Sequence, residues 1–210
     1  MIRSSPVPPV VPAGRMARAE QPVLDLPGGL ELRPWHPGDA GVLVAAARDP
    51  AIAHWNRLHV GSPEEGRKRI ERMHERWRGE RSAIWAMARP GGGEALGLIG
   101  WGDIDLHNGD AEIVYWVTAA ARGAGVAVEA TRRVVRWALD DLGLHRLRLC
   151  HAVENEASCR VAVKAGFSYE GTLRSALLHG DGWHDEHLHA LVEGDPADTA
   201  AGDAGASGPV

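Results

Sequence analysis

The chain of 210 residues has little cysteine, few aromatic residues apart from tryptophan and no long apolar run. Its two cysteines, Cys150 and Cys159, cannot make a disulfide scaffold, which fits a cytoplasmic protein. No apolar run is longer than Val42–Ala47, which is far shorter than the ~20 residues that cross a bilayer, so no membrane partner is expected. Acidic residues outnumber basic ones by 28 to 23, which argues against a general nucleic-acid binder.

The middle of the chain differs in composition from both ends. Residues 1–29 hold six of the thirteen prolines and no apolar period, and residues 194–210 are rich in Gly, Ala and Asp. Such segments bury too little apolar surface to offset their ordering entropy. We therefore expect a flexible leader at 1–29, in which Met16 offers a second start, a disordered tail at 194–210, and one domain at 30–193.

Within that domain the apolar periods predict an α/β fold of the α+β type, with a mixed, mostly antiparallel sheet of about seven strands flanked by about four helices. Helices are expected from about Asp39, from Ser62-Pro63, at 126–142 and at 156–165. Strands are expected at 30–33, 82–89, 95–106, 111–117, 145–152, 167–173 and 184–192. The Asn108-Gly109 pair is the strongest turn signal among them.

The expected strand at 111–117 leads through a glycine-containing turn into the expected helix at 126–142. That helix has no acidic residue before Glu129, and we expect Glu129 to be structural. Unpaired N–H groups and the helix dipole make such a helix start an anion site, and Gly123 and Gly125 leave room for a phosphate. The alternative is an ordinary tight loop. A Walker loop is excluded because Gly-Lys-Ser/Thr is absent, and a dinucleotide fingerprint fails at Val128.

Two motifs carry a family resemblance. The acetyl-CoA pyrophosphate motif of the GNAT N-acetyltransferases, (Gln/Arg)-x-x-Gly-x-(Gly/Ala), is matched by Arg122-Gly123-Ala124-Gly125-Val126-Ala127. The second family motif, Asn-x-x-Ser-x-x-x-x-x-Lys-x-Gly-Phe, resembles the segment 155–167, and segments 169–174 and 182–185 are similar to the RimJ/RimL-like branch. The resemblance covers about residues 30–192 and implies the GNAT fold, in which two central parallel strands, here 113–117 and 147–152, splay apart.

The resemblance implies acetyl-CoA as the acyl donor and assigns residues to it. The segment Arg122–Ala127 would hold the pyrophosphate. Backbone groups near Trp116 and Val117 would hold the pantetheine arm and polarise the thioester carbonyl, and Asn155 would contact the arm. Many relatives protonate the leaving thiolate with a Tyr where this chain has Ala162.

Ser158 is therefore the expected acid, as in the RimL-like branch. The alternative is a hydroxyl that satisfies backbone groups at the helix start. For the general base, Glu112 ranks first because it lies on the strand that carries the arm. Asp103 and Asp105 follow on the preceding strand, and each of the three has a solvated strand face as its alternative.

In relatives the acceptor pocket is built by the N-terminal helices and the following hairpin. Trp55, Asn56, Trp85 and Trp101 are the corresponding candidates, with ordinary packing as the alternative for each tryptophan. His189 stands where many relatives carry Tyr, which indicates a changed acceptor site.

The spacing of His184, His187 and His189 raises the question of a metal site. On a strand His187 and His189 share a face whereas His184 points the other way, so no metal is expected. Cys150 and Cys159 are expected to be small buried side chains, not nucleophiles.

The sequence thus predicts an N-acetyltransferase that moves an acetyl group to a primary amine by direct transfer in a ternary complex. A protein N-terminus is the first expected acceptor. A small amine such as an antibiotic, amino acid, polyamine or aminoacyl-nucleotide is the second. A non-catalytic acyl-CoA sensor is the alternative from another class, and a homodimer is left open.

Overall fold

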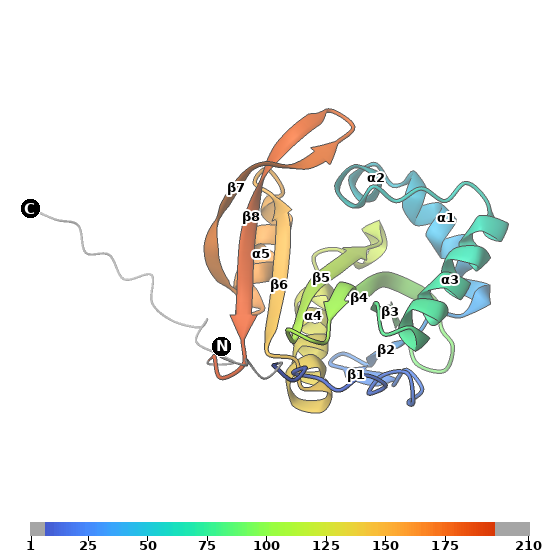
Figure 1. Cartoon of the computed structure of the whole chain (residues 1–210). Coiled ribbons are helices and arrows are strands. Elements are labelled where there is room, and N and C mark those ends of the chain that lie inside the picture. The colour runs from blue at the N-terminus through green and yellow to red at the C-terminus, as the bar shows by residue number, and fades with distance from the viewer. Residues whose placement is uncertain (1–6, 196–210) are drawn as a thin grey trace, which may run out of the picture.

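The computed structural model describes residues 7–195, so residues 1–6 of the expected leader and 196–210 of the expected tail lie outside the described residues. The described chain forms one sheet of eight strands in the order β1-β2-β3-β4-β5-β6-β8-β7 (Figure 1). The strands are β1 (Leu24–Leu26), β2 (Leu30–Pro34), β3 (Ala83–Ala88), β4 (Ala95–Asp105), β5 (Asp110–Val117), β6 (Arg146–Ala152), β7 (Ser168–His179) and β8 (Gly182–Val192).

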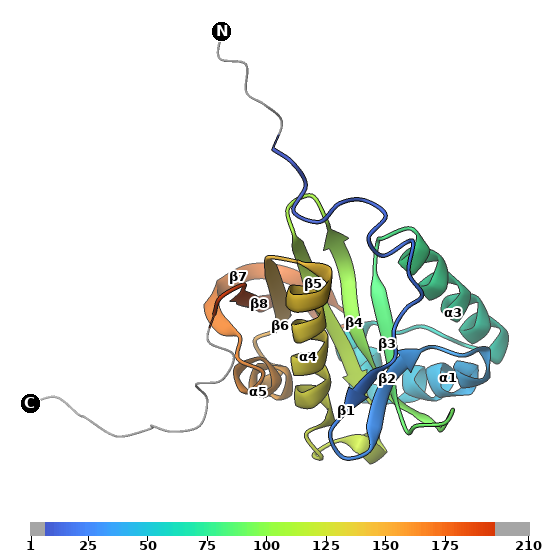
Figure 2. The ribbon, with the colours of Figure 1, turned by 90° about the horizontal axis from the view of Figure 1, so that it is seen from below.

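Helices cover both faces of this sheet, as the second view shows (Figure 2). They are α1 (Ala40–Arg48), α2 (Pro50–Asn56), α3 (Pro63–Arg78), α4 (Val126–Arg136) and α5 (Glu156–Lys164), and α4 continues as a π-helical segment over Trp137–Leu142. One core cluster joins the sheet to α4 and α5, and a second joins it to α1, α2 and α3. Among residues 7–195 no helix is long and apolar enough to cross a membrane.

The two central parallel strands separate, and this confirms the expected GNAT architecture. β5 and β6 pair in register only from Asp110 opposite Arg146 to Glu112 opposite Arg148. Beyond Glu112, β5 continues to Val117 and remains paired with β4 on its other edge. Among the described strands, none pairs with its edge toward β6 there, and a split opens in the middle of the sheet.

The strand pattern gives β5 two chemically different faces. Ala111 and Ile113 point into the core beneath α4, whereas Trp116 belongs to the core beneath α1–α3. Because side chains alternate along a strand, Glu112 shares the Trp116 side and Tyr115 shares the α4–α5 side. The split in the sheet thus connects two faces with different chemistry.

The predicted element order is confirmed, with one extra strand and one extra helix. The helix α2 is short, but Asp49 caps it by accepting hydrogen bonds from the backbone N–H groups of Ala51 and Ile52. Pro50 follows at the first helical position. This Asp-Pro pair is a helix-start signal in the sequence that the apolar period alone missed.

The predicted flexible leader is wrong for residues 7–29, which pack on the domain. Glu80 accepts hydrogen bonds from the N–H groups of Gly14 and Met16, at 2.7 and 2.8 Å, and Met16 is buried. The Trp77 and Trp85 indoles donate to backbone carbonyls of the same segment, and β1 extends the sheet. The composition of the segment indicates how little apolar surface it can bury, but it does not reveal these hydrogen bonds to side chains of the domain.

Candidate active site

A cavity of about 1100 Å³ passes through the split between β5 and β6. Its walls come from α2, the end of β5, the turn before α4, the start of α5 and the β7–β8 hairpin. Of the predicted site residues, those that line it are Trp55, Asn56, Glu112, Trp116, Val117, Arg122, Gly123, Gly125, Val126, Ala127, Asn155 and Ser158. The structure therefore brings together residues from positions 55 to 158 of the chain.

The turn before α4 presents backbone to this cavity. Gly123 and Gly125 have φ angles of +80° and +75°, in the left-handed region that favours glycine. A Cβ atom at either position would meet no protein atom within 4 Å, so the space above the turn is open. Within residues 7–195 no side chain caps α4, so the N–H groups of its first turn can hold an anion. Ala124 lies apart and lines a separate small hollow beside Leu26.

Arg122 is already engaged by the protein. Its guanidinium donates to the Val117 carbonyl at 3.2 Å and to the Asp49 carboxylate at 2.8 Å. The hydrogen bond from Arg122 holds the pKa of Asp49 below its ordinary value. Arg122 thus ties the turn to the start of α2, and its side chain is still 42% exposed at the cavity.

Ser158 is paired with a residue that sequence analysis missed, Tyr115. The Tyr115 hydroxyl and Ser158 Oγ lie 2.6 Å apart, and Asn155 accepts a hydrogen bond from the Ser158 N–H as the cap of α5. Burial raises the pKa of Tyr115 to about 12, although its bond to Ser158 opposes the shift. The phenol therefore keeps its proton at neutral pH. Alternation of side chains along the strand places Tyr115 on the face covered by α5, and this was the signal in the sequence that could have revealed the pair.

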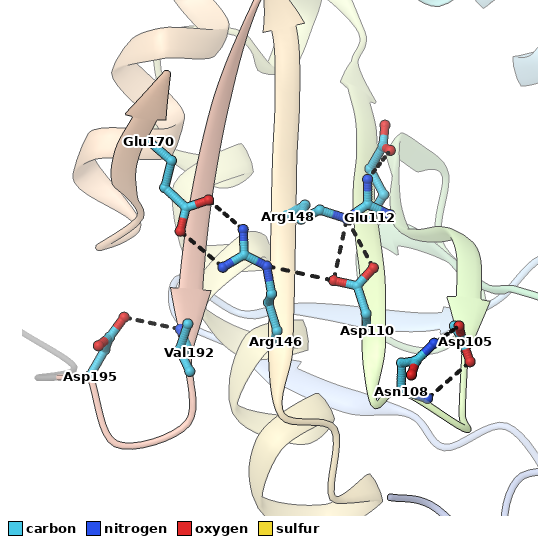
Figure 3. A network of polar contacts seen from close by, with 9 residues as sticks. All are labelled: Asp105, Asn108, Asp110, Glu112, Arg146, Arg148, Glu170, Val192 and Asp195. Carbon is cyan, nitrogen blue, oxygen red and sulfur yellow. Dashed lines mark hydrogen bonds and ion pairs between the residues drawn. The ribbon is translucent and has the colours of Figure 1, made fainter. Parts of the chain in front are cut away.

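Glu112 is the carboxylate among the three base candidates that reaches the cavity. Burial raises its pKa, the nearby acids Glu186, Asp103 and Asp110 raise it further, and Arg148 opposes them at 3.4 Å. Figure 3 shows Arg148 between Glu112 and Asp110. A carboxylate with a raised pKa beside a cavity is suited to accept a proton.

The other two base candidates lie elsewhere. Asp105 accepts hydrogen bonds from the N–H groups of His107 and Asn108 in the β4–β5 turn (Figure 3). Asp103 is 87% exposed and approaches Arg76 at 3.8 Å. Neither lines the cavity, so both fit the solvated alternative.

A second cavity carboxylate, Glu186, was also missed. It lies opposite Ala152 in the β6–β8 register, on the same sheet face as Cys150. Burial raises the pKa of Glu186, with Arg148 opposing it. Burial and the charges of Glu112 and Glu186 raise the pKa of Cys150 to about 12, which keeps that thiol protonated at neutral pH.

The acceptor end is closed by contacts between α2 and the β7–β8 hairpin. His179 Nδ1 lies 2.9 Å from the His54 carbonyl, and Arg57 donates to the Leu178 carbonyl at 3.3 Å. Trp55 packs edge-on against the His179 ring. These contacts place Trp55 and Asn56 at the cavity wall, and their contact with the acceptor stays a prediction.

The predicted acceptor contacts of Trp85 and Trp101 are wrong. Both side chains are fully buried beneath α4, and neither lines the cavity. Trp101 stacks on Trp137 at a ring separation of 5.4 Å, and Trp85 packs edge-on against both. Strand alternation points these two side chains to the α4 face, so both tryptophans serve the core. His189 is also buried away from the cavity, so it does not alter the acceptor site directly.

A split parallel pair beside an uncapped helix start is the arrangement expected of an N-acetyltransferase domain. The family model "Acetyltransferase (GNAT) domain" matches residues 29–168. The chain therefore belongs to the GNAT acetyltransferase family, and the resemblance of its motifs is confirmed.

Two relatives have names that describe ribosomal acetyltransferases. The chain is 34% identical over 101 residues to a putative ribosomal N-acetyltransferase, YdaF, of Bacillus subtilis, which is 48% of this chain and 55% of that protein. It is 30% identical over 99 residues to the ribosomal-protein-serine acetyltransferase of Escherichia coli, 47% of this chain and 55% of that protein. The chain thus spans about half the length of these relatives.

A solved structure agrees in fold. RimL, a ribosomal L7/L12 alpha-N-protein acetyltransferase in complex with coenzyme A, superposes with a TM-score of 0.74 at 19% identity. The match covers 83% of this chain and all of that chain. At this identity the likeness shows a shared fold.

Proposed function

We propose that this chain transfers an acetyl group from acetyl-CoA to a primary amine, and that the amine is a protein N-terminus. The observation that carries the proposal is the cavity through the β5–β6 split, with backbone donors at one end and carboxylates at the other. The residues fit the donor: the α4 turn offers uncapped N–H groups under open space, which suits a diphosphate. Bound acetyl-CoA would supply the activated acyl group.

The split edge of β5 would orient the thioester. Beyond Glu112 the strand has no partner toward β6, so backbone groups near Trp116 and Val117 can bond an extended arm as a strand would. An N–H directed at the thioester carbonyl would stabilise developing negative charge on its oxygen, an effect of about 3–4 kcal/mol where it has been measured in other enzymes.

Protons would move at two separate places. On the α1–α3 face Glu112 would take a proton from the incoming ammonium, directly or through water, because its raised pKa lets it hold one. On the α5 face the Ser158 hydroxyl, backed by the neutral Tyr115 phenol, would donate to the leaving thiolate. The reaction then needs no covalent enzyme intermediate, which agrees with the protonated state of Cys150.

The lining of the acceptor end favours an acceptor with negative charge near its amine. Arg57, Arg69 and Arg72 line the cavity with Arg76. Burial and the neighbouring Arg72 lower the pKa of Arg69, which is the response of a cation that lacks compensating charge. A peptide whose second or third residue is acidic would relieve this excess.

The test is release of free CoA thiol from acetyl-CoA by the full chain with matched peptides and small amines. We expect turnover with peptides bearing a free N-terminal amine and acidic following residues, and a lower rate when those residues are lysine. Turnover with small amines alone would instead favour the small-amine acceptor. Binding of acetyl-CoA without turnover of any amine would favour the sensor.

A further inference from the structure

Four metal-ligating side chains meet on the α5 face of the sheet, on the opposite side from Glu112 and Glu186. His151 comes from β6, Cys159 from α5, and His187 and His189 from β8. One ligand atom from each lies within 4.8 Å of every other. Figure 1 shows the three elements side by side. The prediction of no metal rested on His184, His187 and His189, of which His184 points away, and His151 and Cys159 come from other elements.

The hydrogen bonds of His151 direct a lone pair into this cluster. His151 Nδ1 lies 2.8 Å from the Ala152 carbonyl, so this nitrogen carries the proton and Nε2 is left as an acceptor. A backbone carbonyl that fixes the tautomer of a histidine in this way is the usual outer partner of a metal ligand. The His151 side chain is buried, so water does not compete for this lone pair.

His189 lies next to His151, and hydrogen bonds within the described protein do not satisfy all the ring nitrogens of these two residues. Its Nε2 lies 3.3 Å from His151 Nε2, and its Nδ1 is buried without a partner among the described residues. If Nε2 of His189 carries the proton, Nδ1 is an unsatisfied buried acceptor. If Nδ1 carries it, an unsatisfied donor is buried and two lone pairs face each other. His187 Nδ1 is likewise buried without a partner in residues 7–195.

The spacing suits a tetrahedral ion. Zinc–nitrogen bonds of about 2.0–2.1 Å give a nitrogen–nitrogen edge of about 3.3–3.4 Å in a tetrahedral site. The two Nε2 atoms are already at 3.3 Å. Three imidazoles and one thiolate form a ligand set that favours zinc over calcium or magnesium, which prefer oxygen.

We propose that His151, Cys159, His187 and His189 bind one Zn²⁺ ion in a closed, structural site. Four protein ligands leave no open position for water, so the ion would hold structure instead of activating a nucleophile. It would tie α5 to β6 and β8. Cys159 follows Ser158 directly, so the ion would fix the helix start that presents Ser158 and Asn155 to the cavity. His151 also lines the cavity, but the proposal that these residues bind zinc does not rest on the proposed acetyl transfer.

The matched control is a second group of possible ligands, formed by His54, Asp181 and His184. His184 already has partners on both nitrogens, Glu154 at 3.0 Å and Asp181 at 2.9 Å, so it lacks the unsatisfied nitrogens of the first group. Cys150→Ala is the control for the cysteine, because Cys150 points to the other face of the sheet.

The experiment measures metal content and affinity of the full chain without a histidine tag. Protein purified without chelator is analysed for zinc, then stripped with EDTA and titrated with ZnCl₂. We expect about one zinc per chain, retained in Cys150→Ala and His184→Ala, and at least tenfold weaker binding in Cys159→Ala and His189→Ala. Zinc should raise the Tm of the stripped protein by about 5 °C or more.

Cobalt provides a readout that needs no variant. Co²⁺ added to the stripped wild-type chain should give the intense visible bands of a tetrahedral site and a sulfur-to-cobalt charge-transfer band in the near ultraviolet. The proposal is overturned if the wild-type chain binds no zinc and gives only the weak octahedral cobalt spectrum. It is also overturned if His184→Ala, and not Cys159→Ala, removes the bound metal.

Discussion

The two ends of the cavity are built in different ways. At the donor end the chain offers backbone, through a glycine turn and an uncapped helix start that are continuous in sequence. At the acceptor end it offers side chains from α2, α3, β5 and β8, which are far apart in sequence. A site made of local backbone is encoded in a short motif, whereas a site made of distant side chains depends on how the whole sheet assembles.

The largest expected effect is on stability, and it separates a core tryptophan from a tryptophan at the acceptor end of the cavity. Trp85→Ala should destabilise the protein by about 3–5 kcal/mol, because a fully buried ring leaves a cavity. Trp55→Ala should change stability by about 1 kcal/mol or less and raise KM for the amine several-fold. Thermal unfolding and steady-state kinetics measure the two effects. Equal destabilisation by both changes would mean that Trp55 is also a core residue.

Glu112→Gln tests the acceptor-side base. We expect kcat to fall about 100-fold, because the amine loses its proton acceptor. In the wild-type protein the rate should fall as pH drops through the raised pKa of Glu112, since only the carboxylate accepts a proton. That acidic limb should vanish in Glu112→Gln and remain in the control Asp105→Asn. An unchanged profile in Glu112→Gln would transfer the role to Glu186.

The Tyr115–Ser158 pair tests whether one relay serves the leaving group. Ser158→Ala and Tyr115→Phe should each lower kcat about tenfold without weakening acetyl-CoA binding, and the double variant should be about as slow as either single one. Tyr169→Phe is the matched control, because that hydroxyl bonds Thr172 at an exposed position. Effects that multiply in the double variant would show two independent roles.

The difference between the donor end and the acceptor end of the cavity also explains which site residues can be predicted from the sequence. The α4 turn, Asn155 and Ser158 could be predicted because short motif spacings define them, and Glu112 was ranked first because it lies on the strand expected to carry the arm. Glu186 and the His151–Cys159 group were missed because β6–β8 pairing and the packing of α5 bring them to their sites, and Tyr115 was missed because its partner Ser158 lies on a helix 43 residues further along the chain. Trp85 and Trp101 were misassigned because composition shows that tryptophan is abundant without showing which face of a strand carries it.

The N-terminal segment makes the same point for the fold. Its prolines and lack of apolar period suggested a flexible leader, but Glu80, Trp77 and Trp85 bond its backbone. These partners lie more than fifty residues further along the chain. No local property of the segment could have revealed them.

The central claim is that the glycine turn before α4 holds acetyl-CoA. Its most direct test is the affinity for acetyl-CoA of a variant in which a side chain occupies the space above that turn. Asn tolerates positive φ, so Gly123→Asn should fold normally while its side chain occupies the open space above the turn. Gly143→Asn is the matched control, with φ of +87°, open surroundings and a position at the far end of the same helical run. By calorimetry we predict a Kd for acetyl-CoA at least tenfold higher in Gly123→Asn and unchanged in Gly143→Asn. Equal affinity in both variants and the wild-type chain would show that the turn does not hold the donor.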